Sequence, residues 1–131
     1  MINFELQMLG FSVVLGLVHI VAAAHSARIE RNARRTESPY QPVTPLHSTA
    51  GRLARALENF SETFPLFAAL VLAVIIAGKG GQLSAWGAGL YFGARALYLP
   101  LYVLGLSLIR SLVWYVAVLG IVLLVFALLW G

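Results

Sequence analysis

Four apolar runs, each interrupted by only a few polar residues, account for most of the sequence. They extend over about residues 4–27, 52–77, 83–104 and 108–130. As an α-helix, with a rise of about 1.5 Å per residue, each run is long enough to cross a hydrocarbon core about 30 Å thick. The pattern predicts an all-α integral membrane protein, in which residues 1–131 form one domain, a bundle of four transmembrane helices.

The connections between these runs differ in length and character. Residues 28–51 are polar and contain three prolines, which favour an extended, irregular backbone. The next connection, Gly78–Gln82, is rich in glycine and predicts a tight turn. In the third run, Gly89 and Gly93 are four residues apart. Small residues at this spacing let membrane helices approach closely, so we expect a helix contact there.

The composition supports a membrane protein. Hydrophobic residues make up 60% of the chain and charged residues 11%, with a mean hydropathy of +0.87. Soluble domains carry about 25% charged residues, and a chain this short could not bury so much apolar surface. The absence of cysteine excludes disulfides, cysteine metal sites and a cysteine nucleophile.

The distribution of positive charge predicts the orientation. Six of the nine Lys and Arg residues lie between Arg28 and Arg55, whereas the second connection carries only Lys79. The positive-inside rule therefore places the first connection in the cytoplasm and both termini outside, and we expect a bacterial inner-membrane protein. Basic residues beside apolar segments favour anionic phospholipid headgroups or an anionic ligand as partners, rather than nucleic acid.

A polar face follows the second apolar run into the predicted membrane. Arg52, Arg55, Asn59 and Glu62 recur at helical spacing and therefore share one side of a helix. Polar groups at such a depth are expensive, so they indicate a functional site if other helices provide partners.

The third and fourth runs provide such partners. Arg95, Tyr98 and Tyr102 share one face late in the third run, and Arg110 and Ser111 lie at the start of the fourth. With the predicted orientation, these residues reach the same depth, near the cytoplasmic side, as the polar face of the second run. We therefore expect one shared site.

The residue types at this site favour a ligand with several charges. Arginine binds carboxylates and phosphates with two parallel hydrogen bonds, and a glutamate can bind an amine. A ligand with carboxylates and an amine fits this set, and so does a zwitterionic lipid headgroup. An arginine or a serine hydroxyl can also stabilise a thiolate, which a cofactor would have to bring. No catalytic triad and no metal cluster is visible. A purely structural polar network remains an alternative.

Three segments resemble the MAPEG family, the membrane-associated proteins of eicosanoid and glutathione metabolism. RLARALENFSETFPLF, residues 52–67, is similar to the family's second-helix signature, with Arg55, Asn59, Glu62 and Pro65 at its spacing. ARALYLPLY, residues 94–102, resembles the third-helix motif, and IRS, residues 109–111, resembles the start of the fourth helix.

The resemblance implies a homotrimer of four-helix protomers, with glutathione as the cofactor bound between protomers near the cytoplasmic face. It implies cofactor contacts by residues of helices one to three, namely Arg28, Arg55, Asn59, Glu62, Arg95, Tyr98 and Tyr102. Arg110 would be the catalytic residue that stabilises the glutathione thiolate, with Ser111 assisting it. A lipophilic substrate would approach from the bilayer.

Three functions compete. The first is an enzyme that uses glutathione to conjugate, reduce or isomerise a lipophilic electrophile. The second is a non-catalytic lipid-binding protein, since the family contains such a member. The third is a small multidrug transporter, which depends on an intramembrane glutamate without arginine neighbours. Glu62 shares its face with Arg52 and Arg55, which argues against the transporter.

Overall fold

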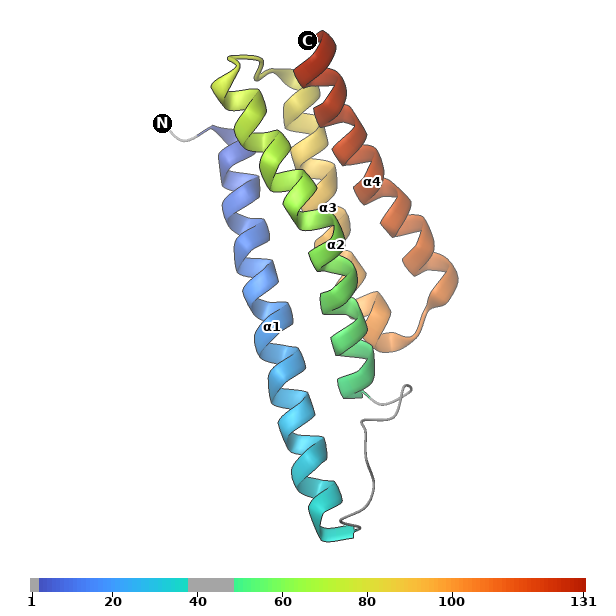
Figure 1. The fold of residues 1–131 in the computed structure, drawn as a ribbon. Coiled ribbons are helices and arrows are strands. Elements are labelled where there is room, and N and C mark those ends of the chain that lie inside the picture. The colour runs from blue at the N-terminus through green and yellow to red at the C-terminus, as the bar shows by residue number, and fades with distance from the viewer. Residues whose placement is uncertain (1–2, 38–48) are drawn as a thin grey trace.

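Four α-helices lie side by side in the computed structural model, which describes residues 3–37 and 49–131 (Figure 1). They are α1 (Phe4–Glu37), α2 (Thr49–Ile76), α3 (Gln82–Leu104) and α4 (Ser107–Trp130). The start of α1 and the end of α4 lie at the same end of the bundle (Figure 1). The predicted all-helical class is therefore confirmed for the described residues.

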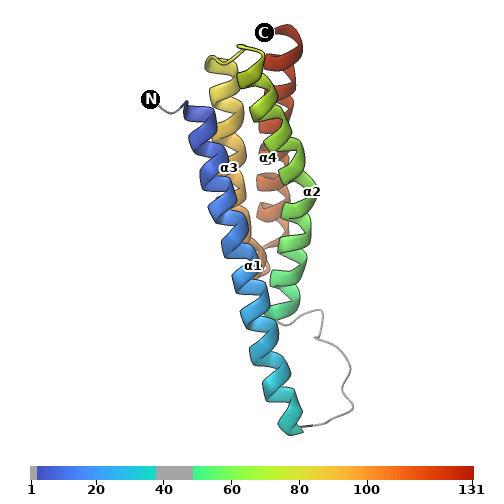
Figure 2. The same cartoon turned by 60° about the vertical axis from the view of Figure 1, so that its left-hand side comes forward.

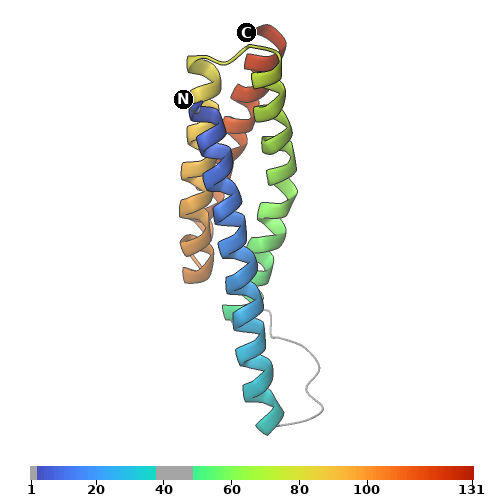
Figure 3. The same ribbon diagram turned by 90° about the vertical axis from the view of Figure 1, so that its left-hand side faces the viewer.

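The first helix is longer than the sequence predicted. We expected it to end near Ala27, but α1 continues to Glu37, and its last part projects beyond the other helices (Figures 2 and 3). The predicted connection over residues 28–51 is therefore wrong at both ends, because α2 also begins earlier, at Thr49. Residues 28–37 contain no glycine or proline, so nothing local stops the helix. The change in hydropathy near Ala27 indicates a membrane boundary rather than a helix end.

Three helices in the described part of the chain are long and apolar enough to cross a membrane, namely α1, α2 and α4. They carry many large apolar side chains on the outside of the bundle, as an environment of lipid allows. The remaining helix, α3, has 23 residues, which corresponds to about 35 Å at 1.5 Å per residue. Its length suits a crossing, but its composition does not mark it as one, so four crossings remain a prediction.

The apolar core lies between α2, α3 and α4. It includes Phe67 and Val71 of α2, Tyr91 of α3 and Leu124 of α4, all fully buried. The ring of Phe67 stacks on that of Tyr91 with 4.1 Å between centroids. The hydroxyl of Tyr91 shares a 2.9 Å hydrogen bond with Thr63, so the one polar group of this cluster has a partner.

Gly87 of α3 and Gly120 of α4 pack against each other where the two helices approach closely. A Cβ atom on Gly87 would lie 2.7 Å from the carbonyl oxygen of Gly120, and one on Gly120 would lie 2.6 Å from that of Gly87. Within one protomer, the pair predicted from the sequence does not form the close helix contact. Gly93 has no atom within 4 Å of its Cβ position, and Gly89 faces only the side chain of Phe4.

Two carboxylates of α1 hold the amino ends of other helices. Glu5 is buried and accepts a 2.5 Å hydrogen bond from Ser84 in the first turn of α3. Glu30 accepts a 3.2 Å hydrogen bond from the backbone N–H of Ala50 at the start of α2. Negative charge is favourable at these ends because the N–H groups of the first turn have no partner within the helix.

Two cations hold the carboxyl ends in the same way. Arg52 donates from Nη1 to the carbonyl of Val103 near the end of α3, at 3.0 Å. Lys79 donates from Nζ to the carbonyl of Leu128 in the last turn of α4, at 2.9 Å. Positive charge is favourable there, since the last carbonyls of a helix are unpaired. The α3–α4 hairpin is therefore held at one end by a residue in the first turn of α2 and at the other by a residue of the connection that follows α2.

Candidate functional site

Six of the predicted site residues meet where α2 begins, α3 ends and α4 begins. Hydrogen bonds and ring contacts connect all six, although they come from three helices. They are Arg55 and Asn59 of α2, Arg95, Tyr98 and Tyr102 of α3, and Arg110 of α4. The expected convergence of polar faces is thus present within one protomer.

Arg95 is the innermost member of this cluster, with an exposed fraction of 0%. Its Nη1 donates to Oδ1 of Asn59 at 2.9 Å, and its Cζ lies 4.2 Å from the ring centroid of Tyr98. Its Nε and Nη2 are buried without a hydrogen-bond partner. Arg95 therefore joins α3 to α2 inside the protomer. Its predicted contact with a ligand remains a prediction.

Tyr102 lies between two arginines. Arg55 donates from Nε to the Tyr102 hydroxyl at 3.2 Å, and the Cζ of Arg110 lies 4.4 Å from the ring centroid of Tyr102. A guanidinium over an aromatic face is attracted by the ring quadrupole. Neither contact is with a carboxylate, so neither pairs the positive charge of an arginine with an acidic side chain. This part of the site favours an anion.

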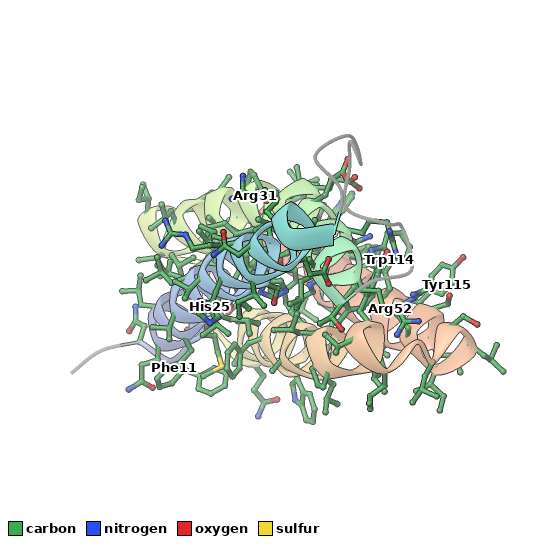
Figure 4. The ribbon with its side chains drawn as sticks, turned by 90° about the horizontal axis from the view of Figure 1, so that it is seen from below. Phe11, His25, Arg31, Arg52, Trp114 and Tyr115 are labelled. Atoms are coloured by element: carbon green, nitrogen blue, oxygen red, sulfur yellow. The ribbon has the colours of Figure 1, made fainter. Side chains whose placement is uncertain are left out.

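Trp114 adds an unused donor on α4. It lies four residues after Arg110, one helical turn further along, and its Nε1 is buried without a hydrogen-bond partner. The neighbouring Tyr115 points away from the bundle and is 65% exposed (Figure 4). A buried indole N–H normally has an acceptor, so this position fits a polar group of a ligand.

Three predicted residues are not brought into the cluster within one protomer. Arg28 is exposed on α1, and Glu62 is exposed on α2, where its charge interacts with Tyr98 only electrostatically. The hydroxyl of Ser111 is directed to its own helix and donates to the carbonyl of Ser107 at 3.0 Å. The roles predicted for these three residues remain predictions.

Comparison with known families decides the identity of the fold. The sequence model of the MAPEG family matches residues 8–130, nearly the whole chain. The chain belongs to the MAPEG family. The resemblance based on the helix motifs is therefore confirmed, and with it a membrane family related to glutathione. A search of curated proteins found no match.

Two contacts of this MAPEG protein at the same end of the bundle were not predicted from the sequence. Arg52 contacts the end of α3, although its position on the polar face of α2 placed it among ligand-binding candidates. Glu30 holds the start of α2, although residues 28–51 were expected to be a connection. Within the ranges 3–37 and 49–131, no three His, Cys, Asp or Glu residues are grouped to hold a metal ion.

Proposed function

We propose that this MAPEG protein is a membrane-bound, glutathione-dependent transferase or peroxidase acting on lipophilic electrophiles. The observation that carries the proposal is the pair of guanidiniums that contact Tyr102, that of Arg55 at its hydroxyl and that of Arg110 at its ring. Within residues 3–37 and 49–131 neither guanidinium forms an ion pair, so they present positive charge at the end of a bundle that exposes many large apolar side chains. An anionic cofactor and a lipophilic substrate can meet at such a place.

The chemistry of the donor set fits glutathione. Glutathione has two carboxylates, an amine, amide carbonyls and a thiol. The guanidinium groups of the arginines can donate two parallel hydrogen bonds to each carboxylate. The unpartnered indole N–H of Trp114 can donate to a carbonyl or carboxylate oxygen. Bound glutathione would supply a thiol that, as the thiolate, attacks an electrophilic carbon or a peroxide oxygen of the substrate.

Arg110 has the best position to hold negative charge. It is the fourth residue of α4, so the N–H groups of the first helical turn add partial positive charge beside it. Its guanidinium packs on the ring of Tyr102, and its N–H groups are proposed to bind the ligand. A donor held in place before reaction stabilises charge at no reorganisation cost, so Arg110 is the proposed thiol activator.

The site is proposed to be completed between protomers of a homotrimer. Arg28 and Glu62 are exposed on a single protomer, which leaves their side chains available to a neighbouring copy. In this arrangement Glu62 meets the cofactor amine, and Ser111 assists Arg110. The proposed location is a bacterial inner membrane. Both termini are placed outside the cytoplasm, because the basic residues are concentrated around the end of α1 and the start of α2.

Glutathione binding and an Arg110→Ala variant test this function. Titration calorimetry on the detergent-solubilised protein should show glutathione binding, with a thiolate absorbance in the ultraviolet. Arg110→Ala should abolish that absorbance and lower kcat with a reactive aryl halide by about 10²–10³-fold, as for the loss of one preorganised donor. Arg31→Gln, an exposed arginine of α1, is the control. Unchanged turnover of Arg110→Ala would exclude it as the activator.

A non-catalytic lipid-binding role is the alternative. An apolar groove of about 300 Å³ between α1 and α2, lined by residues that include Gly16, Leu57 and Phe64, supports it. This role predicts phospholipid retained through purification, detected by native mass spectrometry, and no heat on adding millimolar glutathione. Heat and a thiolate absorbance would instead favour the enzyme.

A further inference from the structure

The end of α3 is closed by two backbone hydrogen bonds, and neither of them reaches the carbonyl of Val103. The N–H of Leu106 donates to the carbonyl of Leu101, and the N–H of Gly105 to that of Tyr102, both at 3.1 Å. Gly105 has a φ of +77°, the left-handed conformation that such a helix end requires. The next carbonyl, that of Val103, receives no bond from this arrangement.

Arg52 of α2 supplies the missing donor. Its Nη1 lies 3.0 Å from the Val103 carbonyl oxygen. The guanidinium also packs on the turn itself, since a Cβ atom on Gly105 would lie 3.6 Å from Nη1 and 3.8 Å from Nη2. The start of α2 is thus attached to the turn between α3 and α4 by a charged hydrogen bond, which is stronger than a neutral one.

The same turn determines where Arg110 lies. The N–H of Arg110 donates to the carbonyl of Leu106 at 3.1 Å, and the N–H of Leu106 closes the end of α3. The guanidinium of Arg110 packs on the ring of Tyr102, whose own carbonyl accepts the N–H of Gly105. A shift of the turn therefore moves both the backbone of Arg110 and the ring that supports its side chain.

We infer that Arg52 is a positioning residue: it fixes the α3–α4 turn through Val103 and thereby holds Arg110 in register with Tyr102. The catalytic consequence rests on the proposed function, in which Arg110 acts on the cofactor thiol. The contact between Arg52 and Val103 does not depend on the proposed function, because it joins two groups of this chain and involves no ligand. Arg52 is thereby distinguished from Arg55, whose side chain contacts Tyr102 directly.

Hydrogen exchange tests the contact without any ligand. In the full-length protein in detergent, Arg52→Gln should speed deuterium uptake in peptides covering residues 103–110 by about tenfold, the size expected from losing one hydrogen bond to a charged donor. Uptake in the middle of α1 should not change. Arg52→Lys should restore part of the protection, because an ammonium can donate to one carbonyl. Arg31→Gln removes an equal charge from an exposed site and should leave the turn unaffected.

Kinetics test the positioning role. Arg52→Gln should lower kcat by about 10–100-fold, since a displacement of about 1 Å at a reacting group can have that effect. The KM for glutathione should rise by much less than kcat falls, because Arg55 and Asn59 of α2, which are not part of the turn, still bind the cofactor. Arg52→Lys should recover part of kcat.

The outcomes separate the two proposals. If uptake in 103–110 is the same in Arg52→Gln and the native protein, the positioning role is wrong. If the KM for glutathione rises in proportion to the loss of kcat, Arg52 is a ligand contact and the inference is also wrong. If the native protein binds no glutathione, the proposed function fails, and the exchange result alone decides whether Arg52 holds the turn.

Discussion

The contact between Gly87 and Gly120 makes a quantitative prediction about Gly120→Ala. A Cβ atom at position 120 would lie 2.6 Å from the carbonyl oxygen of Gly87 and 2.9 Å from the backbone nitrogen of Tyr91. Ordinary van der Waals contact begins at 3.4 Å, so α3 must retreat by about 0.8 Å. Both obstacles are backbone atoms, which cannot rotate away as a flexible side chain can.

The size of the effect follows from two opposing terms. Overpacking a well-packed contact lowers the free energy of unfolding by about 1–3 kcal/mol. Alanine in place of glycine inside a helix raises it by about 1 kcal/mol, because glycine loses more backbone entropy on folding. Gly120→Ala should therefore lower the free energy of unfolding by about 0–2 kcal/mol. Gly93→Ala, with no atom within 4 Å of the new Cβ, should show only the gain.

The comparison of these two variants isolates the clash. Unfolding in mixed micelles of increasing denaturing-detergent content, followed by tryptophan fluorescence, gives both free energies. We expect Gly120→Ala to be less stable than Gly93→Ala by about 1–3 kcal/mol. Gly10→Ala, which also has open space at its Cβ position, is a second control on another helix. Equal stability of all three variants would show that α3 and α4 do not approach through these glycines.

Three further predictions concern the polar contacts. Tyr102→Phe should weaken glutathione binding about tenfold in calorimetry, because Arg55 loses the hydroxyl that orients it; unchanged affinity would contradict that role. Ser84→Ala should lower the free energy of unfolding by about 1–3 kcal/mol, since it leaves the buried carboxylate of Glu5 without its donor. Ser111→Ala, which removes the hydroxyl of an exposed serine, is the control. Trp114→Phe removes a buried donor that has no partner, so it should raise the free energy of unfolding of the ligand-free protein by about 1 kcal/mol. The same variant should weaken glutathione binding. A lower free energy of unfolding would show that the indole N–H has a partner.

Local patterns in the sequence were sufficient for much of the site. Arg55 and Asn59 share a face because of helical spacing, and so do Arg95 and Tyr102. The charge distribution then placed these faces at one depth. The structure agrees within the protomer, where Arg95 contacts Asn59 and Arg55 contacts Tyr102. Which of these groups is enclosed could not be predicted, because burial depends on how the helices pack together.

The amino-acid sequence by itself determined the apolar helices, their polar faces and the family, because hydropathy and helical spacing act within each segment. Only the tertiary structure decided which small residues meet and which cations close helix ends. Gly89 and Gly93 have the four-residue spacing typical of packed membrane helices, yet within the protomer α3 and α4 approach through Gly87 and Gly120. Arg52 shares a face with ligand-binding candidates, yet it holds the turn before α4. Such pairings depend on the rotation and offset of one helix against another, which no single segment encodes.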